Sequence, residues 1–339
     1  MKAVVVYGNG EVNRVDLPMP EIGDYECLIQ MKACGICNST DLKIIKNKIN
    51  FLSITYPAIL GHENVGEVVA VGDKVKYIKV GDRFVNPLTK LPQDSPFHSA
   101  FGGFMEYGFV QDRKAMFEMG LADSPLELGA CRQIPSDFDY TDAGMLLTLK
   151  ETYSCLDNFG FRPGMEVLVY GDGPVGLSIA KFLRLEGASY IASVGHHHDR
   201  LEIIRTRAAI DLAINSHETD VNAAVGGRRF DLVIDAVGST SIIKEGVNLL
   251  KRGGKLGVYG VLDQNDGMLN LFDIPSHTNI HMLMLPYGEH NYHDKVMEMI
   301  AKGDINPKDY YSHVMPVEEI EQAVQMTADR SALKVIVTF

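Results

Sequence analysis

The chain has 339 residues, of which 46% are hydrophobic and 22% charged, a composition that is typical of globular proteins and excludes a disordered or fibrous chain. At roughly 100–200 residues per domain, this length predicts two domains. The net charge of −12 argues against nucleic-acid binding, and no apolar run approaches the about 18–20 residues that cross a bilayer, so we expect a cytoplasmic protein without membrane contact.

The first 150 residues predict a β-rich domain. Short strands are expected at residues 3–7, 26–32, 66–71 and 83–85. Glycine turns bound the last two, and short strands separated by such turns favour a barrel-like β domain. Residues 91–103 lack periodicity and contain two prolines and two glycines, which predicts a loop. Thr141 is expected to cap the N-terminus of a helix that runs to residue 156.

Residues 151–286 predict a second domain in which strands alternate with helices. Strands are expected at residues 167–170, 190–194, 212–214, 232–234 and 256–259, and helices at 177–185 and 200–207. Continuous apolar strands are typical of a parallel sheet covered on both faces, so the pattern predicts a doubly wound α/β fold. Beyond this domain we expect helices at 294–301 and 317–327 and a strand at 334–339.

A glycine-rich turn follows the first strand of the second domain. Residues 171–176 read Gly-Asp-Gly-Pro-Val-Gly, a G-x-G-x-x-G pattern between a strand and a helix. The three glycines permit a tight turn, close approach of a pyrophosphate, and close packing of the helix on the strand. The pattern therefore predicts dinucleotide binding by Gly171, Gly173, Pro174, Val175 and Gly176. A purely structural glycine turn is the alternative.

The end of the second strand of this domain predicts which dinucleotide is bound. An NAD site usually has Asp or Glu there to hold the ribose 2′-OH, but this chain has Gly195. We interpret Gly195 as leaving room for a 2′-phosphate, to which His196, His197 and Arg200 would donate hydrogen bonds. The pattern predicts NADP(H) rather than NAD(H). Two alternatives stay open: Asp199 swings back to the ribose, or the histidines belong to a solvated loop.

Three residues of the first domain are candidate zinc ligands. Cys37 offers a thiolate, His62 an imidazole and Glu63 a carboxylate, and a catalytic zinc site takes three protein ligands and keeps one open position. Zinc acts there as a Lewis acid, which suits hydride transfer between an alcohol and a nicotinamide. Taken singly, the cysteine fits a buried core position and the His-Glu pair a solvated turn. Beside a dinucleotide-binding pattern, the three together predict a metal site.

The chain resembles the medium-chain, zinc-dependent alcohol dehydrogenase family over essentially its whole length. The matching motifs are Gly35-Ile36-Cys37, Gly61-His62-Glu63, Gly66-Glu67-Val68, Val71-Gly72, Val80-Gly81-Asp82-Arg83, Gly102-Gly103-Phe104, Gly171–Gly176, Asp235-Ala236-Val237-Gly238 and Gly253-Gly254. The resemblance implies a GroES-like β-barrel catalytic domain (1–150, with 287–339 returning to it) and a Rossmann domain (151–286). Within the family the chain looks most similar to polyol, sugar and secondary-alcohol dehydrogenases.

The resemblance also implies roles for individual residues. Cys37 and His62 would be zinc ligands, and Glu63 would be a ligand or a close neighbour of the metal. Ser39 or Thr40 would pass the substrate proton outward. Further cofactor contacts are implied at Val237 and Gly238. The family usually has one residue fewer between the cysteine and the following aspartate, so Asp41 and Thr40 are both candidates to support the zinc histidine.

Two features depart from the family pattern. Residues 91–103 replace the four-cysteine lobe of many relatives and contain no cysteine, so we expect no structural zinc. Leu147 stands where relatives carry another zinc ligand, and leucine cannot bind zinc. Glu151 follows one helical turn later on the same face; it is either a further ligand or a surface or neighbouring carboxylate. We expect one catalytic Zn²⁺, held by Cys37, His62 and Glu63.

The expected function is zinc-dependent interconversion of a secondary alcohol, polyol or sugar with its ketone or aldehyde, using NADP(H). One alternative is a zinc-independent NADPH reductase of quinones or enones, which Leu147 favours. The other is an NADPH-binding protein without catalysis. By resemblance we expect a homodimer or homotetramer that associates through residues 273–285, although this apolar run also fits a plain buried strand.

Overall fold

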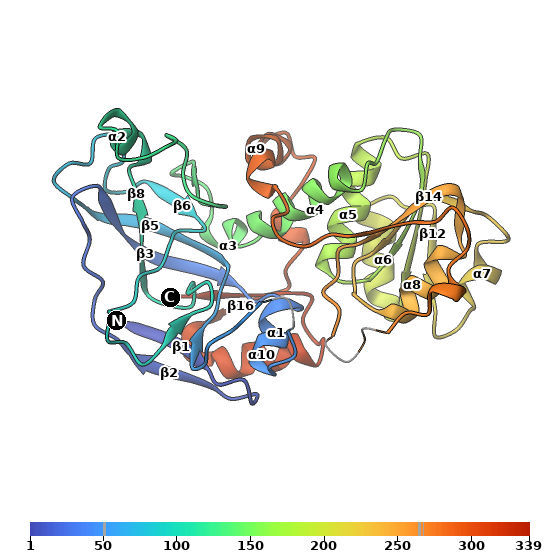
Figure 1. Cartoon of the computed structure of the whole chain (residues 1–339), viewed down its shortest axis with the longest axis horizontal. Helices are drawn as coiled ribbons and strands as arrows, with labels where there is room; N and C mark the ends of the chain where they lie inside the picture. Colours follow the sequence, from blue (N-terminus) through green and yellow to red (C-terminus); the bar gives the residue numbers. More distant parts are fainter. Residues whose placement is uncertain (50–51, 264–265, 267) are drawn as a thin grey trace. The chain divides into compact units, whose positions relative to one another are not determined.

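The computed structural model describes residues 1–49, 52–263, 266 and 268–339. The chain forms two compact units, which are coloured along the sequence in Figure 1. The first unit comprises Met1–Leu147 and Tyr311–Phe339, and the second unit comprises Thr148–Tyr310. The second unit is therefore inserted into the first. The expected domain boundaries lay at residues 150 and 287, so the return to the first unit comes later than expected.

Two sheets build the first unit. The smaller sheet has the order β2-β1-β4-β7, formed by β1 (Lys2–Val6), β2 (Val12–Asp16), β4 (Ala58–Ile59) and β7 (His98–Ser99). The larger sheet has the order β16-β17-β3-β5-β6-β9, and β8 also pairs with β3. Its strands are β3 (Glu26–Gly35), β5 (Glu63–Val71), β6 (Arg83–Val85), β8 (Tyr107–Gln111), β9 (Arg132–Ile134), β16 (His313–Pro316) and β17 (Val335–Thr338).

Strand β3 organises the larger sheet. Its inward side chains Cys27, Ile29 and Met31 are fully buried, as expected for a strand with one face on the core. The last part of β3 pairs with β5 on one side and with β17 on the other, so that Val337 lies opposite Cys34. The segment 311–339 therefore completes a sheet that begins near residue 26.

The first unit has few helices. They are α1 (Thr40–Ile45), α2 (Arg113–Glu118), α3 (Tyr140–Ala143), η4 (Val317–Glu319) and α10 (Ile320–Ala328). The expected N-cap at Thr141 is wrong. Asp139 caps α3 instead, because its carboxylate accepts hydrogen bonds from the backbone N–H groups of Thr141 and Asp142. Helix α4 (Leu146–Asn158) then begins separately, two residues after Gly144.

The second unit is built on a six-stranded parallel sheet. Its order is β12-β11-β10-β13-β14-β15. The strands are β10 (Glu166–Tyr170), β11 (Tyr190–Gly195), β12 (Leu212–Asn215), β13 (Phe230–Asp235), β14 (Leu250–Val258) and β15 (Asn279–Met282). Strand order reverses at β10, which lies between β11 and β13. This reversal is the topological switch point at which doubly wound sheets bind their ligands, and the predicted fold class is confirmed.

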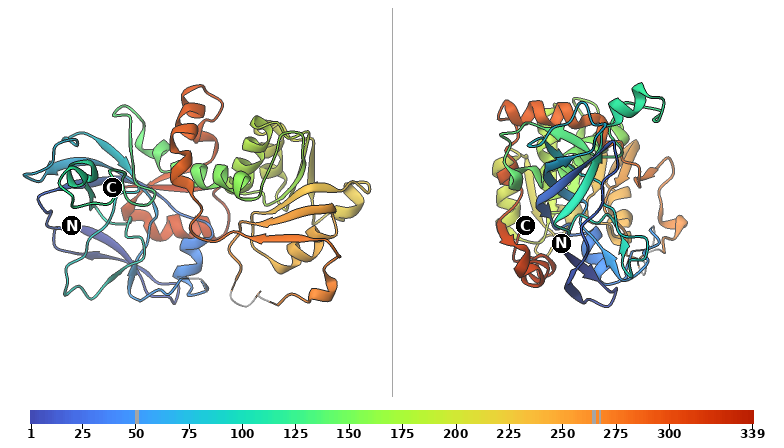
Figure 2. Two further views of the ribbon diagram at one scale, coloured as in Figure 1. Left: turned by 45° about the horizontal axis from the view of Figure 1, so that its top comes forward. Right: turned by 90° about the vertical axis from the view of Figure 1, so that its left-hand side faces the viewer.

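Helices connect the parallel strands of the second unit. They are α5 (Pro174–Leu185), α6 (His198–Arg207), α7 (Val221–Ala224), α8 (Thr240–Val247) and α9 (His293–Ala301), with short η1 (Leu271–Asp273), η2 (Glu289–Tyr292) and η3 (Pro307–Asp309). Helices α5 and α6 pack on β10, β11 and β12, whereas α8 packs on β13 and β14, as Figure 2 allows the reader to follow. Right-handed crossovers that run in opposite directions from β10 place these helices on opposite faces of the sheet.

Residues 287–310 belong to the second unit, and hydrogen bonds join them to helix α4. The side-chain amide of Asn158 donates to the carbonyl of Tyr287 at 2.9 Å, and the hydroxyl of Tyr292 donates to Asp157 at 2.8 Å. Within the part of the chain that the structure describes, no helix has both the length and the hydropathy to cross a membrane.

Candidate active site

The segment after β3 positions Cys37. The backbone N–H of Cys37 donates to Asp41 Oδ2 at 2.8 Å, and the backbone N–H of Thr40, at the start of α1, donates to Cys37 Sγ at 3.4 Å. The β3–β5 register places Gly35 opposite Glu63. Because Cys37 lies two residues beyond Gly35, and His62 immediately precedes Glu63, the antiparallel pair brings the three predicted metal ligands to one place.

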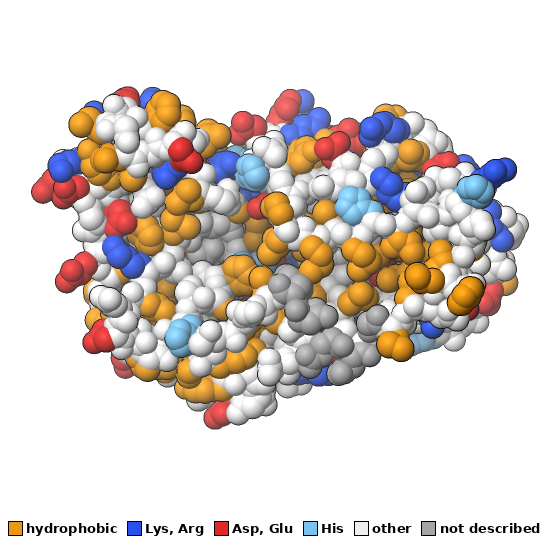
Figure 3. All heavy atoms as spheres, in the orientation of Figure 1, with side chains coloured by type: hydrophobic (Ala, Val, Ile, Leu, Met, Phe, Trp, Pro, Cys, Tyr) orange, Lys and Arg blue, Asp and Glu red, His pale blue; other side chains and the backbone are white. Residues whose placement is uncertain are grey.

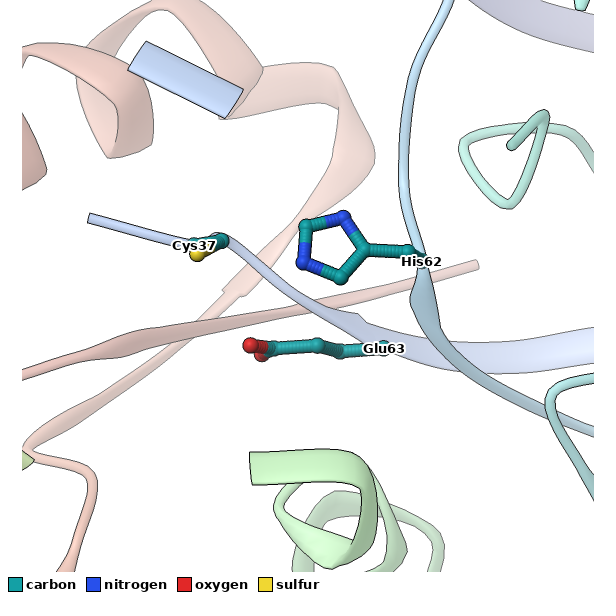
Figure 4. Close-up of side chains that lie close together, drawn as sticks. All are labelled: Cys37, His62 and Glu63. Atoms are coloured by element: carbon teal, nitrogen blue, oxygen red, sulfur yellow. The ribbon is translucent and has the colours of Figure 1, made fainter. Parts of the chain in front are cut away.

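Cys37, His62 and Glu63 form a cluster. One potential ligand atom from each of the three side chains lies within 4.8 Å of the others. Figure 4 shows one ring nitrogen of His62 directed toward the side on which the sulfur of Cys37 and the carboxylate of Glu63 lie. Glu63 is buried, whereas Cys37 and His62 are partly exposed. The cluster is therefore reachable from solvent on one side.

Asp41 supports the imidazole of this cluster. Its Oδ1 lies 3.3 Å from Nδ1 of His62, and the Asp41 side chain is completely buried. Burial alone lowers the pKa of His62, but the Asp41 carboxylate and the Cys37 sulfur outweigh it and hold this pKa well above its ordinary value. Of the two candidates from the sequence, it is thus Asp41 and not Thr40 that faces the histidine. A carboxylate on one ring nitrogen fixes the tautomer and orientation that a metal-binding histidine needs.

The two candidate proton-relay residues lie beside the cluster. Ser39 Oγ is buried and has no hydrogen-bond partner among the described residues, whereas Thr40 is the first residue of α1. A buried hydroxyl without a protein partner is the group that a ligand or water most readily engages. The choice between Ser39 and Thr40 stays a prediction.

Glu63 has a second partner that the sequence did not reveal. Lys334 Nζ lies 2.5 Å from one carboxylate oxygen of Glu63 and 2.7 Å from the other, and only 3% of either side chain is exposed. Burial lowers the pKa of Lys334, but Glu63 outweighs this effect and the pKa is raised. A Cβ at Gly35 would lie 2.2 Å from Glu63 Oε2 and 3.0 Å from Lys334 Cε, so this ion pair requires glycine at position 35.

The donor set of the cluster fits a zinc ion. Zinc binds thiolate at about 2.3 Å and imidazole or carboxylate at about 2.0–2.2 Å, so ligand atoms around a tetrahedral zinc lie about 3.3–3.8 Å apart. The ligand atoms of Cys37, His62 and Glu63, all within 4.8 Å of one another, need only small movements to reach this geometry. A thiolate, an imidazole and a carboxylate leave one position open.

Glu151 and Leu147 lie on either side of the division between the units. Leu147 is buried and ends the first part of the first unit. Glu151 belongs to the second unit, where its Oε2 accepts a hydrogen bond from the hydroxyl of Tyr259 at 2.9 Å. Burial and the neighbouring Glu151 raise the pKa of Tyr259 well above its ordinary value. The Glu151 carboxylate thus has a partner of its own, and its part in metal binding stays a prediction.

The glycine-rich turn between β10 and α5 has the geometry of a phosphate-binding turn. Gly171 has a φ of +125°, a conformation that other residues rarely adopt. A Cβ at Gly176 would lie 1.9 Å from the Gly171 carbonyl oxygen, so close packing demands glycine there. A Cβ at Gly173 would meet no protein atom within 4 Å, which leaves open space at the start of α5. Pro174 and Val175 form the first turn of that helix, whose N–H groups suit a pyrophosphate.

The end of β11 differs from our interpretation of Gly195. A Cβ at Gly195 would lie 2.5 Å from Cβ and 2.6 Å from Oδ2 of Asp172, so the space beside this glycine is filled by the aspartate rather than left open. Asp172 Oδ2 accepts hydrogen bonds from the backbone N–H groups of His196 and His197 and contacts His197 Nδ1. A carboxylate therefore does lie at this strand end, contributed by the first turn.

Further residues gather at the carboxyl ends of the parallel strands. The imidazoles of His196 and His217 are stacked, with ring centroids 4.1 Å apart, and Arg200 lies in the first turn of α6. After β13, the Asp235 carboxylate accepts hydrogen bonds from the backbone of Val237 and Gly238, both at 2.8 Å. The predicted cofactor residues of the second unit thus lie on turns at one end of its sheet.

The residues that the sequence did not single out are Asp172 and Lys334, whereas Phe101 lies on a loop that was expected to border the substrate site. The ring of Phe101 lies 5.0 Å from that of His62, and its φ is +80°, which is rare for a non-glycine residue. Asp172 carried a weak signal, because a carboxylate inside a phosphate-binding turn is unusual. For Lys334 the sequence offered no such signal.

The two folds together define the class of dehydrogenases that join a GroES-like domain to a Rossmann domain. The GroES-like domain of alcohol dehydrogenases matches residues 23–119, and the zinc-binding dehydrogenase domain matches residues 174–302, together about two thirds of the chain. The chain belongs to the zinc-type, medium-chain alcohol dehydrogenase family. Enzymes of this family are oxidoreductases that bind a nucleotide cofactor.

Individual relatives agree with this placement. Sorbitol dehydrogenase of Bacillus subtilis (strain 168) is 28% identical over 353 residues, which cover 99% of this chain and 97% of the relative. The NADP-dependent isopropanol dehydrogenase of Entamoeba histolytica is 27% identical, with 98% and 93% covered. The structure of the alcohol dehydrogenase TADH from Thermus sp. ATN1 superposes with a TM-score of 0.78 at 24% identity, over 100% of this chain and 99% of the other, and shares its fold.

Proposed function

We propose that this protein is a zinc-dependent, NADP(H)-using dehydrogenase that interconverts a secondary alcohol, a polyol or a sugar with the corresponding ketone or aldehyde. The observation that carries the proposal is the cluster of Cys37, His62 and Glu63, with Asp41 behind the histidine. Relatives named for sorbitol and for isopropanol support a polyol or secondary alcohol as substrate. Zinc, when bound, supplies a Lewis acid that polarises the substrate oxygen.

Residues of this chain would bind the metal, orient the histidine and transfer the substrate proton. Cys37, His62 and Glu63 hold the metal, and Asp41 keeps the His62 ring oriented. In alcohol oxidation the hydroxyl proton must leave as a hydride leaves the carbon. Ser39 is the relay residue that we favour over Thr40, because its buried hydroxyl has no partner among the described residues and can take up a hydrogen bond from the substrate.

NADP(H) is the cofactor that we propose. The glycine turn at residues 171–176 and the turn at Val237 and Gly238 would receive the dinucleotide at the switch point of the sheet. The imidazoles of His196 and His197 at the end of β11 support a 2′-phosphate ligand, and Arg200 follows in the first turn of α6. One relative is named as NADP-dependent, which agrees with this choice.

Metal content and turnover test this proposal together. Tag-free protein is expected to retain about one zinc per chain after excess metal is removed, since the proposal includes one catalytic zinc and no structural zinc. A panel of polyols, sugars and secondary alcohols is then assayed with NADP⁺ and with NAD⁺. We expect turnover that a chelator abolishes and added zinc restores. Protein that holds no zinc after zinc has been offered would overturn the metal-dependent mechanism.

A zinc-independent NADPH reductase of quinones or enones is the second candidate. It is favoured by Leu147 at the position of another ligand, and by the ion pair in which Lys334 engages both oxygens of Glu63. Such an enzyme would reduce quinones with NADPH at an unchanged rate in the presence of a chelator. Absence of quinone reduction together with zinc-dependent alcohol oxidation would exclude it.

We also propose a homodimer or homotetramer in which copies of the chain meet at the outer strand of the second unit. Strand β15 lies at the edge of the sheet and is partly exposed, and not a plain buried strand. Exposed apolar side chains lie along the same segment, and they include Phe272, Met282, Met284 and Leu285. Figure 3 shows hydrophobic side chains gathered over the second unit. Sedimentation would give a monomer if this proposal were wrong.

A further inference from the structure

The carboxylate of Asp172 connects the turn after β10 to the turn after β11, at the carboxyl ends of the parallel strands. Asp172 is the second residue of the glycine turn, and only 9% of it is exposed. Its Oδ2 accepts the backbone N–H of His196 at 2.7 Å and that of His197 at 2.9 Å, and it lies 2.9 Å from Nδ1 of the His197 ring. The turn after β10 therefore dictates the path of the turn after β11.

The Asp172 side chain is ionised in this arrangement. Burial raises its pKa, but the N–H groups of His196 and His197 outweigh burial and hold the pKa below its ordinary value. An ionised carboxylate only accepts hydrogen bonds, so Nδ1 of His197 carries a proton in this contact. The contact fixes the orientation of the ring and leaves Nε2 for a further partner. The His197 side chain is 38% exposed, so such a partner can come from solvent.

Three further histidines lie near the end of β11 beside His197, together with polar and charged groups. The His196 ring stacks on His217, and Ser216 Oγ lies 3.0 Å from His196 Nδ1. His198 is engaged by Glu218, at 2.6 Å between Nε2 and Oε1. Asp199 and Arg200 follow in the first turn of α6. The charged and titratable groups at the end of β11 are thus Asp172 from the glycine turn, His196 and His197, the first-turn residues His198, Asp199 and Arg200 of α6, and His217 and Glu218 from the segment after β12.

We propose that Asp172 is a positioning residue for cofactor choice, because it holds the His197 ring so that Nε2–H donates to the 2′-phosphate of NADP(H). This inference rests on the proposed use of NADP(H). Since Nδ1 already carries the proton that Asp172 accepts, Nε2 can donate only when the ring is protonated. A neutral ring would turn a lone pair toward the phosphate. The doubly protonated ring is therefore the form that the 2′-phosphate selects, and this inference predicts weaker NADPH binding at pH 8 than at pH 6.

The competing role for Asp172 is direct binding of the adenosine ribose. A carboxylate at this strand end accepts hydrogen bonds from the ribose hydroxyls in NAD sites and selects against a 2′-phosphate. The two roles predict opposite responses to loss of the charge. If Asp172 positions His197, loss of the charge weakens NADPH binding. If it binds the ribose, the same change weakens NADH binding and spares or improves NADPH binding.

The test measures NADPH and NADH dissociation constants of the full chain without substrate, by calorimetry at pH 6, 7 and 8. The variants are Asp172→Asn, His197→Gln and their double variant. At pH 6 we expect each single variant to bind NADPH about tenfold more weakly, the effect of one charge-assisted hydrogen bond, and NADH within about twofold of wild type. The double variant should be no weaker than the single variants, because both substitutions remove the same bond.

The pH profile separates positioning from structural damage. The 2′-phosphate itself titrates near pH 6, so the slope that remains in His197→Gln is the baseline. Wild type should lose NADPH affinity from pH 6 to pH 8 more steeply than this baseline, and Asp172→Asn should follow the baseline. His198→Gln is the matched control, because its ring is held by Glu218, and it should keep the wild-type slope.

Three results would overturn the inference. The first is weaker NADH binding with unchanged NADPH binding in Asp172→Asn. The second is equal loss of both cofactors in Asp172→Asn with a lowered unfolding temperature, which would indicate a structural role alone. The third is a wild-type preference for NADPH that neither variant changes, which would leave the proposed function standing. Wild-type protein that binds NADH and not NADPH would instead refute the proposed cofactor as well.

Discussion

The ammonium group of Lys334 lies 2.5 Å from one oxygen of Glu63 and 2.7 Å from the other, although 271 positions separate the two residues in the chain. Both side chains are buried, so each charge depends on the other. The pair also occupies the carboxylate that we propose as a zinc ligand. Lys334 therefore links the stability of the first unit to the readiness of the metal site.

Replacing Lys334 should destabilise the first unit. Lys334→Met leaves Glu63 buried without its counter-charge, and breaking a buried pair costs about 3–5 kcal/mol of unfolding free energy. Urea unfolding of the metal-free protein measures this change. In the double variant Lys334→Met with Glu63→Gln no charge is left uncompensated, and it should recover most of the loss. Equal destabilisation of the single and double variants would contradict the importance of the pair.

The contribution of Lys334 should also depend on pH in a defined direction. Its pKa is raised above the ordinary value of 10.5, chiefly because Glu63 outweighs the effect of burial. A raised lysine pKa stabilises the folded state below the unfolded-state pKa, and this stability is lost as pH rises through the folded-state pKa. The difference between wild type and Lys334→Met should be constant from pH 6 to 9 and shrink above about pH 10.5. If the difference in unfolding free energy between wild type and Lys334→Met shrank at acidic pH instead, the predicted direction of the pH dependence would be wrong.

Cys37 is a proposed metal ligand, and the nearby Cys34 serves as its matched control. Cys34 is fully buried, and burial raises the pKa of its thiol, whereas Cys37 Sγ belongs to the cluster. We expect Cys37→Ser to lose its zinc and its alcohol oxidation, and Cys34→Ala to retain about one zinc per chain. Metal analysis of both purified variants decides the matter. Equal zinc content in the two would remove Cys37 from the site.

Asp41 should increase the zinc affinity of the cluster without binding the metal itself. Asp41→Asn keeps the shape of the side chain but removes the charge that faces His62 Nδ1 at 3.3 Å. Loss of such a supporting carboxylate typically weakens metal affinity by about 10–100-fold. Competition with a zinc chelator would measure the affinity. Asp41→Asn also tests how the Cys37 segment is held in place, because the backbone N–H of Cys37 donates to the other Asp41 oxygen. Zinc affinity equal to wild type would show that the contact is dispensable.

Gly173 and Gly176 should respond differently to an added methyl group. A Cβ at Gly173 meets no protein atom within 4 Å, and the backbone there is extended, so Gly173→Ala should fold with wild-type stability. The methyl group would occupy the space proposed for the pyrophosphate and weaken cofactor binding. Gly176→Ala places its Cβ 1.9 Å from a backbone oxygen and should lower the unfolding temperature itself. Gly173→Ala with unchanged NADPH and NADH affinity would argue against a pyrophosphate at this turn.

Phe101 should reveal strain beside the metal cluster. Its left-handed backbone costs roughly 1–3 kcal/mol, and its partly exposed ring packs on His62 at 5.0 Å. Phe101→Asn relieves the strain, since asparagine tolerates this conformation, whereas Phe101→Leu keeps the strain and loses the ring contact. We therefore expect Phe101→Asn to unfold at higher urea concentration than Phe101→Leu. The reverse order would show that the ring contact outweighs the strain.

The fold of the second unit could be predicted closely because its signals are local. Each buried parallel strand is a continuous apolar run, and the glycine turn marks where the first one ends. Two-residue strands such as β4 and β7 have no such run, and the sequence did not single them out. The run at residues 273–285 was noticed, but its sequence did not distinguish an edge strand such as β15 from a buried one. The helix near residue 141 was misplaced because two capping residues stand close together, and Asp139 reaches the free N–H groups.

The candidate site was predictable only in part. Cys37, His62 and Glu63 carry donor chemistry in their side chains, so they stand out wherever the fold places them. Lys334 became a partner of Glu63 through the pairing of β17 with β3, a contact between distant segments that no local pattern contains. Asp172 was passed over because the glycines around it explained the turn without it. Its effect depends on parallel pairing of β10 with β11, which brings it to Gly195.

The insertion of the second unit into the first has a consequence for synthesis on the ribosome. Residues 148–310 are translated as one uninterrupted stretch and contain every strand of the parallel sheet, so this unit can fold while later residues are still being added. The first unit must wait, because β17 is translated only after the whole insertion. Until then β3 has one edge unpaired beside Cys34, and Glu63 lacks its counter-charge. We therefore expect the cluster that we propose as the zinc site to be completed only after β17 has been translated.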